Sequence, residues 1–178
     1  MVDLKFFDIP ETVRLAVEQL KEKGVTFATI HGNDPIIKAA VAEKGDLKLL
    51  AVTVLTSFDE SDMVKMGFTG SVQDLVLIRS RKAFMLGCDG VVASPLEALP
   101  LRNELDSKFL IVTPGIRPGL NRDMETDDQK RIATAEKAII NGADHVVIGR
   151  PISTSSDPIL TIKTIQKEIE AGLANSPR

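Results

Sequence analysis

The chain has 178 residues, enough for one ordinary domain with a sizeable core. Hydrophobic residues make up 43% and charged residues 26%, a globular balance, and the net charge of −3 disfavours a nucleic-acid partner, which usually needs a basic face. A single cysteine, Cys88, excludes an internal disulfide and is interpreted as a small buried hydrophobe. Because no apolar run reaches the ~18 residues that span a bilayer and no signal peptide is recognisable, we expect a cytoplasmic protein.

Short apolar runs alternate with helical stretches along the chain. Several of these runs are β-branched and almost continuously apolar, which is typical of parallel strands covered on both faces. The predicted strands span residues 2–9, 26–30, 47–55, 90–93, 109–113 and 145–148.

The intervening helices carry recognisable start signals. Pro10 stands where a first helical residue tolerates proline, and Asp34-Pro35 and Asp157-Pro158 each predict an N-cap followed by proline. Thr134 is a further candidate cap, for a helix that ends near Asn141-Gly142. In the last predicted helix an apolar stripe is formed by Ile159, Ile162, Ile165 and Ile169.

Strict alternation of strands and helices predicts an α/β fold with a parallel sheet in a single domain over residues 1–178. The sheet could be open and doubly wound, or it could curl as in a (β/α) barrel. A complete eight-unit barrel needs at least ~200 residues, whereas six units of ~30 residues fill this chain. Length alone therefore favours an open sheet or an incomplete barrel.

The first candidate site lies on the first predicted strand. Asp3 and Lys5 are two residues apart, so their side chains point to the same face, and Asp8 lies near the carboxyl end where such folds build their sites. A lysine held between carboxylates stays protonated and can donate a proton to a developing carbanion. A structural ion pair at a strand end explains the same residues.

Two further clusters follow later strands. The loop that begins Thr113-Pro114-Gly115-Ile116-Arg117 offers backbone N–H groups and a guanidinium to an anion, and Gln129 could close over the ligand. Gly149 and Arg150 directly follow the last strand, where barrels often bind phosphate. The alternatives are a solvated surface loop for the first of these clusters and a strand cap with an exposed arginine for the second.

Several other polar residues have two interpretations. Thr56, which follows the third strand with Thr53 and Ser57 nearby, could bind the edge of a heterocycle or cap a turn. His31 and His145 are interpreted as structural. The acidic residues at 59–62 lack metal-ligand spacing and are interpreted as a solvated turn, so no metal site is expected.

Taken together, the segments DLKFFDIPETV, LLAVTVLTS, GVVASP, VTPGIRP, DQKR and VIGRPI resemble the orotidine 5'-phosphate decarboxylase family. They occur in the family's order between residue 2 and about residue 160. The pattern Asp-x-Lys-x-x-Asp alone marks a wider group of phosphosugar barrels. The added motifs make the resemblance specific to the nucleotide decarboxylases.

The resemblance implies a TIM-type (β/α)8 barrel that is incomplete here, with about six βα units corresponding to strands 3–8. It implies decarboxylation of orotidine 5'-phosphate to uridine 5'-phosphate and CO2 in pyrimidine biosynthesis, with no metal or organic cofactor. By matching motif, Lys5 would donate the proton to C6 of the pyrimidine, and Asp3 would hold Lys5 beside the substrate carboxylate. Asp8 and Thr12 would act across the interface of a homodimer with shared active sites.

The same resemblance implies a phosphate site made by Arg117, Gln129, Gly149 and Arg150, with Thr56 near the pyrimidine or the ribose phosphate. The family's two earlier strands, which bring a ribose-binding aspartate and a second lysine, have no match in this sequence. A non-catalytic barrel remnant that at most binds nucleotide phosphate is therefore an alternative. A related phosphosugar lyase is a third hypothesis. It is disfavoured because TPGIRP followed by DQKR fits the nucleotide decarboxylases better.

Overall fold

A single parallel sheet is the centre of the computed structural model, which describes residues 1–120 and 131–177. In these residues six strands lie side by side in the order of the sequence. All six predicted strands are confirmed, but most are shorter than the apolar runs that predicted them. Their bounds are β1 Val2–Phe6, β2 Phe27–His31, β3 Lys48–Val52, β4 Gly90–Val92, β5 Leu110–Thr113 and β6 His145–Val146.

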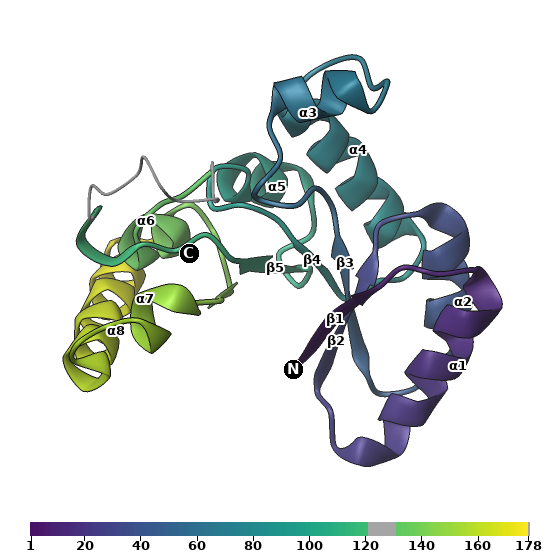
Figure 1. The fold of residues 1–178 in the computed structure, drawn as a ribbon, viewed down its shortest axis with the longest axis horizontal. Helices are drawn as coiled ribbons and strands as arrows, with labels where there is room; N and C mark the ends of the chain where they lie inside the picture. The colour runs from purple at the N-terminus through teal and green to yellow at the C-terminus, as the bar shows by residue number, and fades with distance from the viewer. Residues whose placement is uncertain (121–130, 178) are drawn as a thin grey trace.

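The strand order decides between the two architectures that the sequence left open. A doubly wound sheet reverses its strand order at a switch point, whereas each strand here pairs with the next one in the chain. The sheet therefore winds in one direction and curls as an incomplete barrel, with helices along its outside (Figure 1). In the described part of the chain, β1 and β6 each pair on one side only.

The helices confirm most of the predicted start signals. Thr134 accepts a hydrogen bond from the Lys137 N–H and Asp157 accepts one from the Leu160 N–H, as N-caps do. The helices of the described residues are α1 Pro10–Leu20, α2 Asp34–Glu43, α3 Glu60–Lys65, α4 Val72–Met85, α5 Ala98–Glu104, α6 Ala135–Ile140, α7 Arg150–Ser153 and α8 Pro158–Asn175.

Two local predictions were wrong. Asp34 is the first residue of α2 rather than its N-cap, because the extended Asn33 precedes it, and its carboxylate pairs instead with Lys82. The acidic residues at 59–62 are not a solvated turn, since Asp59 and Asp62 form a reciprocal capping box that begins α3.

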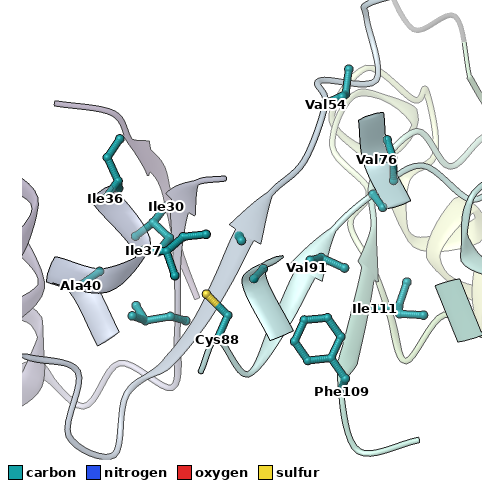
Figure 2. Packing of buried hydrophobic residues seen from close by; sticks show 14 of the residues in the cluster. Ile30, Ile36, Ile37, Ala40, Val54, Val76, Cys88, Val91, Phe109 and Ile111 are labelled. Atoms are coloured by element: carbon teal, nitrogen blue, oxygen red, sulfur yellow. The ribbon is translucent and has the colours of Figure 1, made fainter. Parts of the chain in front are cut away.

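The core lies on both faces of the sheet. On β3, Leu49 and Ala51 pack into the large cluster beneath the helices, whereas Leu50 and Val52 pack with Val92 on the concave side. Cys88 belongs to the large cluster, where burial raises the pKa of its thiol to about 12, so it is a core residue as predicted (Figure 2). The two-sided burial that the apolar runs predicted is confirmed.

The stripe predicted on α8 is only half buried. Ile165 is 5% exposed and packs in a second cluster with Ile169, but Ile159 is 67% exposed and Ile162 is 40% exposed. α8 packs against α6, and Gly172 allows the close approach, because a Cβ there would lie 2.9 Å from the Glu136 carbonyl oxygen. None of the helices described has the length and apolar character needed to cross a membrane.

Candidate functional site

A cavity of about 350 Å³ opens at the carboxyl ends of the strands. Its wall includes Asp3 and Lys5 of β1, Thr56 after β3, Arg117 after β5, and Gly149 and Arg150 after β6. The sheet thus brings together side chains that are up to 147 positions apart, from residue 3 to residue 150, because parallel strands all end at one edge. Each of the three predicted clusters contributes to this one cavity.

Asp3 and Lys5 form an ion pair at one end of the cavity. The Lys5 Nζ donates to an Asp3 oxygen at 2.8 Å, with the two side chains 39% and 36% exposed. The other Asp3 oxygen accepts a hydrogen bond of 2.8 Å from the hydroxyl of Thr29, a fully buried residue of β2. The Asp3 carboxylate is therefore held from both sides, by Lys5 and by Thr29.

The backbone at Lys5 is unusual. Lys5 has a φ of 49°, the only positive φ outside glycine in the part of the chain described, and the register between β1 and β2 shifts between Val2 and Phe6. The Lys5 N–H donates to the Thr29 hydroxyl at 2.9 Å instead of to a strand carbonyl. Such a conformation costs roughly 1–3 kcal/mol and often marks a functional site.

Asp8 and Thr12 do not join this cavity. Asp8 is exposed, and one of its oxygens accepts a hydrogen bond of 2.7 Å from the Ile9 N–H. Thr12 lies exposed in the first turn of α1. Among the described residues Lys5 therefore pairs with the Asp3 carboxylate alone, and not with Asp3 and Asp8 together as the sequence predicted.

The opposite part of the wall is cationic. Arg117 and Arg150 both line the cavity, and so does Gly149, the residue before α7. The Arg117 backbone is fixed, because its N–H donates to the Ala133 carbonyl at 2.9 Å. Gln129, the remaining predicted phosphate ligand, lies outside the described residues.

The smaller polar residues divide into two groups. Thr56, which is 8% exposed, and Ser57 line the cavity, whereas Thr53 donates to the Val92 carbonyl and is structural. His31 stacks on Phe7 with ring centres 4.3 Å apart, and His145 meets an edge of Phe27. Neither histidine lines the cavity, which agrees with their structural interpretation.

Sequence reasoning missed three buried polar residues next to the site. Thr29 is a polar residue in the middle of an apolar strand, a signal that could have been noticed. Arg131 and Glu97 are 9% and 4% exposed and form an ion pair directly behind the cavity wall. Arg131 ends the DQKR segment, but nothing local in the sequence indicates that Glu97 is its partner.

The chain matches known proteins over almost its whole length. A model of the Orotidine 5'-phosphate decarboxylase / HUMPS family matches residues 1–165. A protein of Methylococcus capsulatus named orotidine 5'-phosphate decarboxylase is 54% identical over 168 residues, which are 94% of this chain and 69% of that protein. One of the same name from Nitrobacter winogradskyi is 48% identical over 97% of this chain and 71% of its own length.

Solved structures are similar as well. The crystal structure of orotidine 5'-phosphate decarboxylase from Lactobacillus acidophilus superposes with a TM-score of 0.78 at 36% identity, over 95% of this chain and 74% of that one. The enzyme of the same name from Pyrococcus horikoshii has a TM-score of 0.70 at 22% identity, a likeness of fold alone. The aligned part of this chain thus corresponds to about three quarters of each of these chains.

Proposed function

Because the chain belongs to the orotidine 5'-phosphate decarboxylase / HUMPS family, we propose that it removes CO2 from orotidine 5'-phosphate to give uridine 5'-phosphate. One observation carries this proposal. A lysine–aspartate pair and two arginines line a single cavity of about 350 Å³, which is of the size that small-molecule sites have. The reaction is a step of pyrimidine biosynthesis, and it needs both a proton donor and an anchor for a phosphate.

The cationic wall binds the substrate's phosphate. Arg117 presents a planar guanidinium and Arg150 a second one, so both can form paired hydrogen bonds to phosphate oxygens. Gly149 contributes backbone polar groups without a side chain to obstruct them, and Gln129 completes the phosphate site. Binding energy from this remote group helps to hold the pyrimidine in its reacting position.

Lys5 works at the other end of the substrate. The bond from C6 to the carboxylate carbon breaks, CO2 leaves, and the electron pair stays on C6. The Lys5 ammonium stabilises that charge as it develops and then donates its proton to C6. Asp3 holds the ammonium in place through their ion pair, and Thr56 contacts the pyrimidine or the ribose phosphate.

The six strands correspond to strands 3–8 of a TIM-type barrel, and residues 1–178 form one domain. Two copies form a homodimer in the cytoplasm, in which Asp8 and Thr12 reach the partner's site. The exposure of both residues, and their absence from the cavity of their own chain, support this role.

A phosphate-binding protein without catalysis is the second candidate. It is favoured by the side-chain exposure of Lys5 and Asp3, 39% and 36%, because a strongly solvated pair stabilises a developing carbanion less than a desolvated one. The two candidates make different predictions about turnover.

The deciding experiment is to follow the ultraviolet absorbance of orotidine 5'-phosphate mixed with the purified chain. We expect conversion to uridine 5'-phosphate, lowered by about 10²- to 10⁴-fold in Lys5→Ala. Lys48→Ala is the matched control, because Lys48 begins β3 at the opposite end of the sheet and lies over the Phe27 ring. This control should leave the rate unchanged.

The other results are equally decisive. Binding of uridine 5'-phosphate without any turnover would favour the second candidate over the enzyme. Equal rates in the wild type and in Lys5→Ala would refute the role of Lys5. Faster conversion of a sugar phosphate than of the nucleotide would favour the phosphosugar lyase.

A further inference from the structure

One buried ion pair, Arg131–Glu97, lies behind the cavity wall. An Arg131 Nη1 donates to a Glu97 oxygen, and the other oxygen of Glu97 accepts a hydrogen bond of 2.8 Å from the Ser94 N–H. The remaining Nη2 of Arg131 donates to the carbonyls of Val54 and Leu55 at 3.2 and 2.9 Å. A desolvated arginine with three acceptors has little freedom to move.

These contacts join two separate parts of the wall. Val54 and Leu55 line the cavity and immediately precede Thr56. Ser94 follows Ala93, which lines the cavity after β4. Each of these segments is therefore fixed by the same two side chains, although the first follows β3 and the second follows β4.

The third part of the wall is reached through the backbone. Two residues beyond Arg131, Ala133 donates to the Gly115 carbonyl at 3.3 Å and accepts a hydrogen bond of 2.9 Å from the Arg117 N–H. The position of Arg131 is thus coupled to that of Arg117. A shift of the ion pair would move the segment that carries a phosphate-binding cation.

We infer that Arg131 and Glu97 are positioning residues, which hold the walls after β3, β4 and β5 in the arrangement that binds the nucleotide. Neither side chain lines the cavity, so neither acts on the substrate directly. That the ligand is a nucleotide rests on the proposed function. That Arg131 and Glu97 hold the cavity wall does not.

The chain supplies a matched control at the other end of the sheet. Arg102 pairs with Asp144, donates to the carbonyls of Gly142 and Phe109, and the same Asp144 oxygen accepts from the Ile111 N–H. The two arginines have side chains that are equally exposed, at 11%. This pair resembles Arg131–Glu97 in chemistry but lies away from the cavity.

The test uses double variants that replace each pair with apolar side chains of similar size, Arg131→Met with Glu97→Leu, and Arg102→Met with Asp144→Leu. Removing both partners avoids leaving a buried charge uncompensated, so both proteins are expected to fold. Hydrogen–deuterium exchange is measured on the full chain and compared among the wild type and the two variants. Steady-state kinetics with orotidine 5'-phosphate are then measured on the same samples.

We expect faster exchange at residues 54–57 and 115–117 in the first variant only. We also expect its kcat/KM to fall by about 10- to 100-fold, mainly through KM, because small displacements of binding groups have effects of this size. The control variant should exchange faster around residues 109–111 and 142–144 and keep its kcat/KM.

Unchanged exchange in the cavity segments of the first variant would overturn the inference, whether or not the wild type is active. Equal losses of kcat/KM in both variants would also overturn it, since that result indicates a general loss of stability. An inactive wild type would count against the proposed function alone, because the exchange measurement would still decide the positioning role.

Discussion

The hydroxyl of Thr29 serves as the hydrogen-bond acceptor for the backbone N–H of Lys5, where β1 is irregular. It accepts from the Lys5 N–H and donates to Asp3, so one buried atom supports both the unusual backbone at Lys5 and the orientation of its carboxylate partner. The strain at Lys5 is therefore compensated locally. The lysine at the cavity wall thus depends on Thr29, which does not itself line the cavity.

Thr29→Val should separate this role from ordinary stability. Valine has nearly the same shape but leaves the Lys5 N–H without its acceptor, which costs about 1–3 kcal/mol and disorients Asp3. Thr53→Val is the control, because Thr53 is equally buried but its hydroxyl donates to the Val92 carbonyl rather than to Lys5 or Asp3. Both variants should lose stability to urea, but only Thr29→Val should lower kcat; equal kcat values would contradict the assignment.

Which residues could be predicted depends on how far their partners lie along the chain. Lys5 and Arg150 stand out because charged residues on or directly after an apolar strand are uncommon. The pairing of Thr29 with Asp3 joins residues 26 positions apart, and that of Arg131 with Glu97 joins residues 34 apart. Contacts of this kind depend on strand register and loop path, which no local pattern specifies.

At the scale of elements, α8 shows the limit of periodicity. The isoleucine stripe correctly predicted a helix, but it did not predict that Ile159 and Ile162 are exposed. Which part of a stripe is buried depends on where the neighbouring helix lies. Similarly, the apolar run at 47–55 is longer than the strand that it predicted. β3 ends at Val52, and residues 54–55 leave the sheet and line the cavity.

Gly172→Ala tests the contact between α8 and α6. Alanine favours a helix by about 1 kcal/mol over glycine. Its Cβ would lie 2.9 Å from both the Glu136 carbonyl oxygen and the Ile139 Cβ, and such overpacking costs about 1–3 kcal/mol. We expect a net loss of stability in urea unfolding, whereas Leu173→Ala, at a position 63% exposed, should change little. A stabilised Gly172→Ala would show that the two helices are not closely packed.

At the scale of the whole molecule, the candidate site residues lie together at the carboxyl ends of the strands. The sequential strand order brings residues from both ends of the chain to a single cavity, and this arrangement follows from parallel strands that each pair with the next. The motifs sufficed to identify the family, since they lie at these strand ends. The chain spans 69% and 71% of the length of two curated relatives. In the described residues β1 pairs with a neighbouring strand on one side only, and its Leu4 is 68% exposed.

A crystal structure of the chain with uridine 5'-phosphate tests the central claim most directly. The phosphate should lie within ~4 Å of the guanidinium groups of Arg117 and Arg150, with C6 of the pyrimidine facing the Lys5 ammonium. A nucleotide bound outside this cavity, or one whose phosphate contacts Lys5 while its base contacts the arginines, would contradict the account.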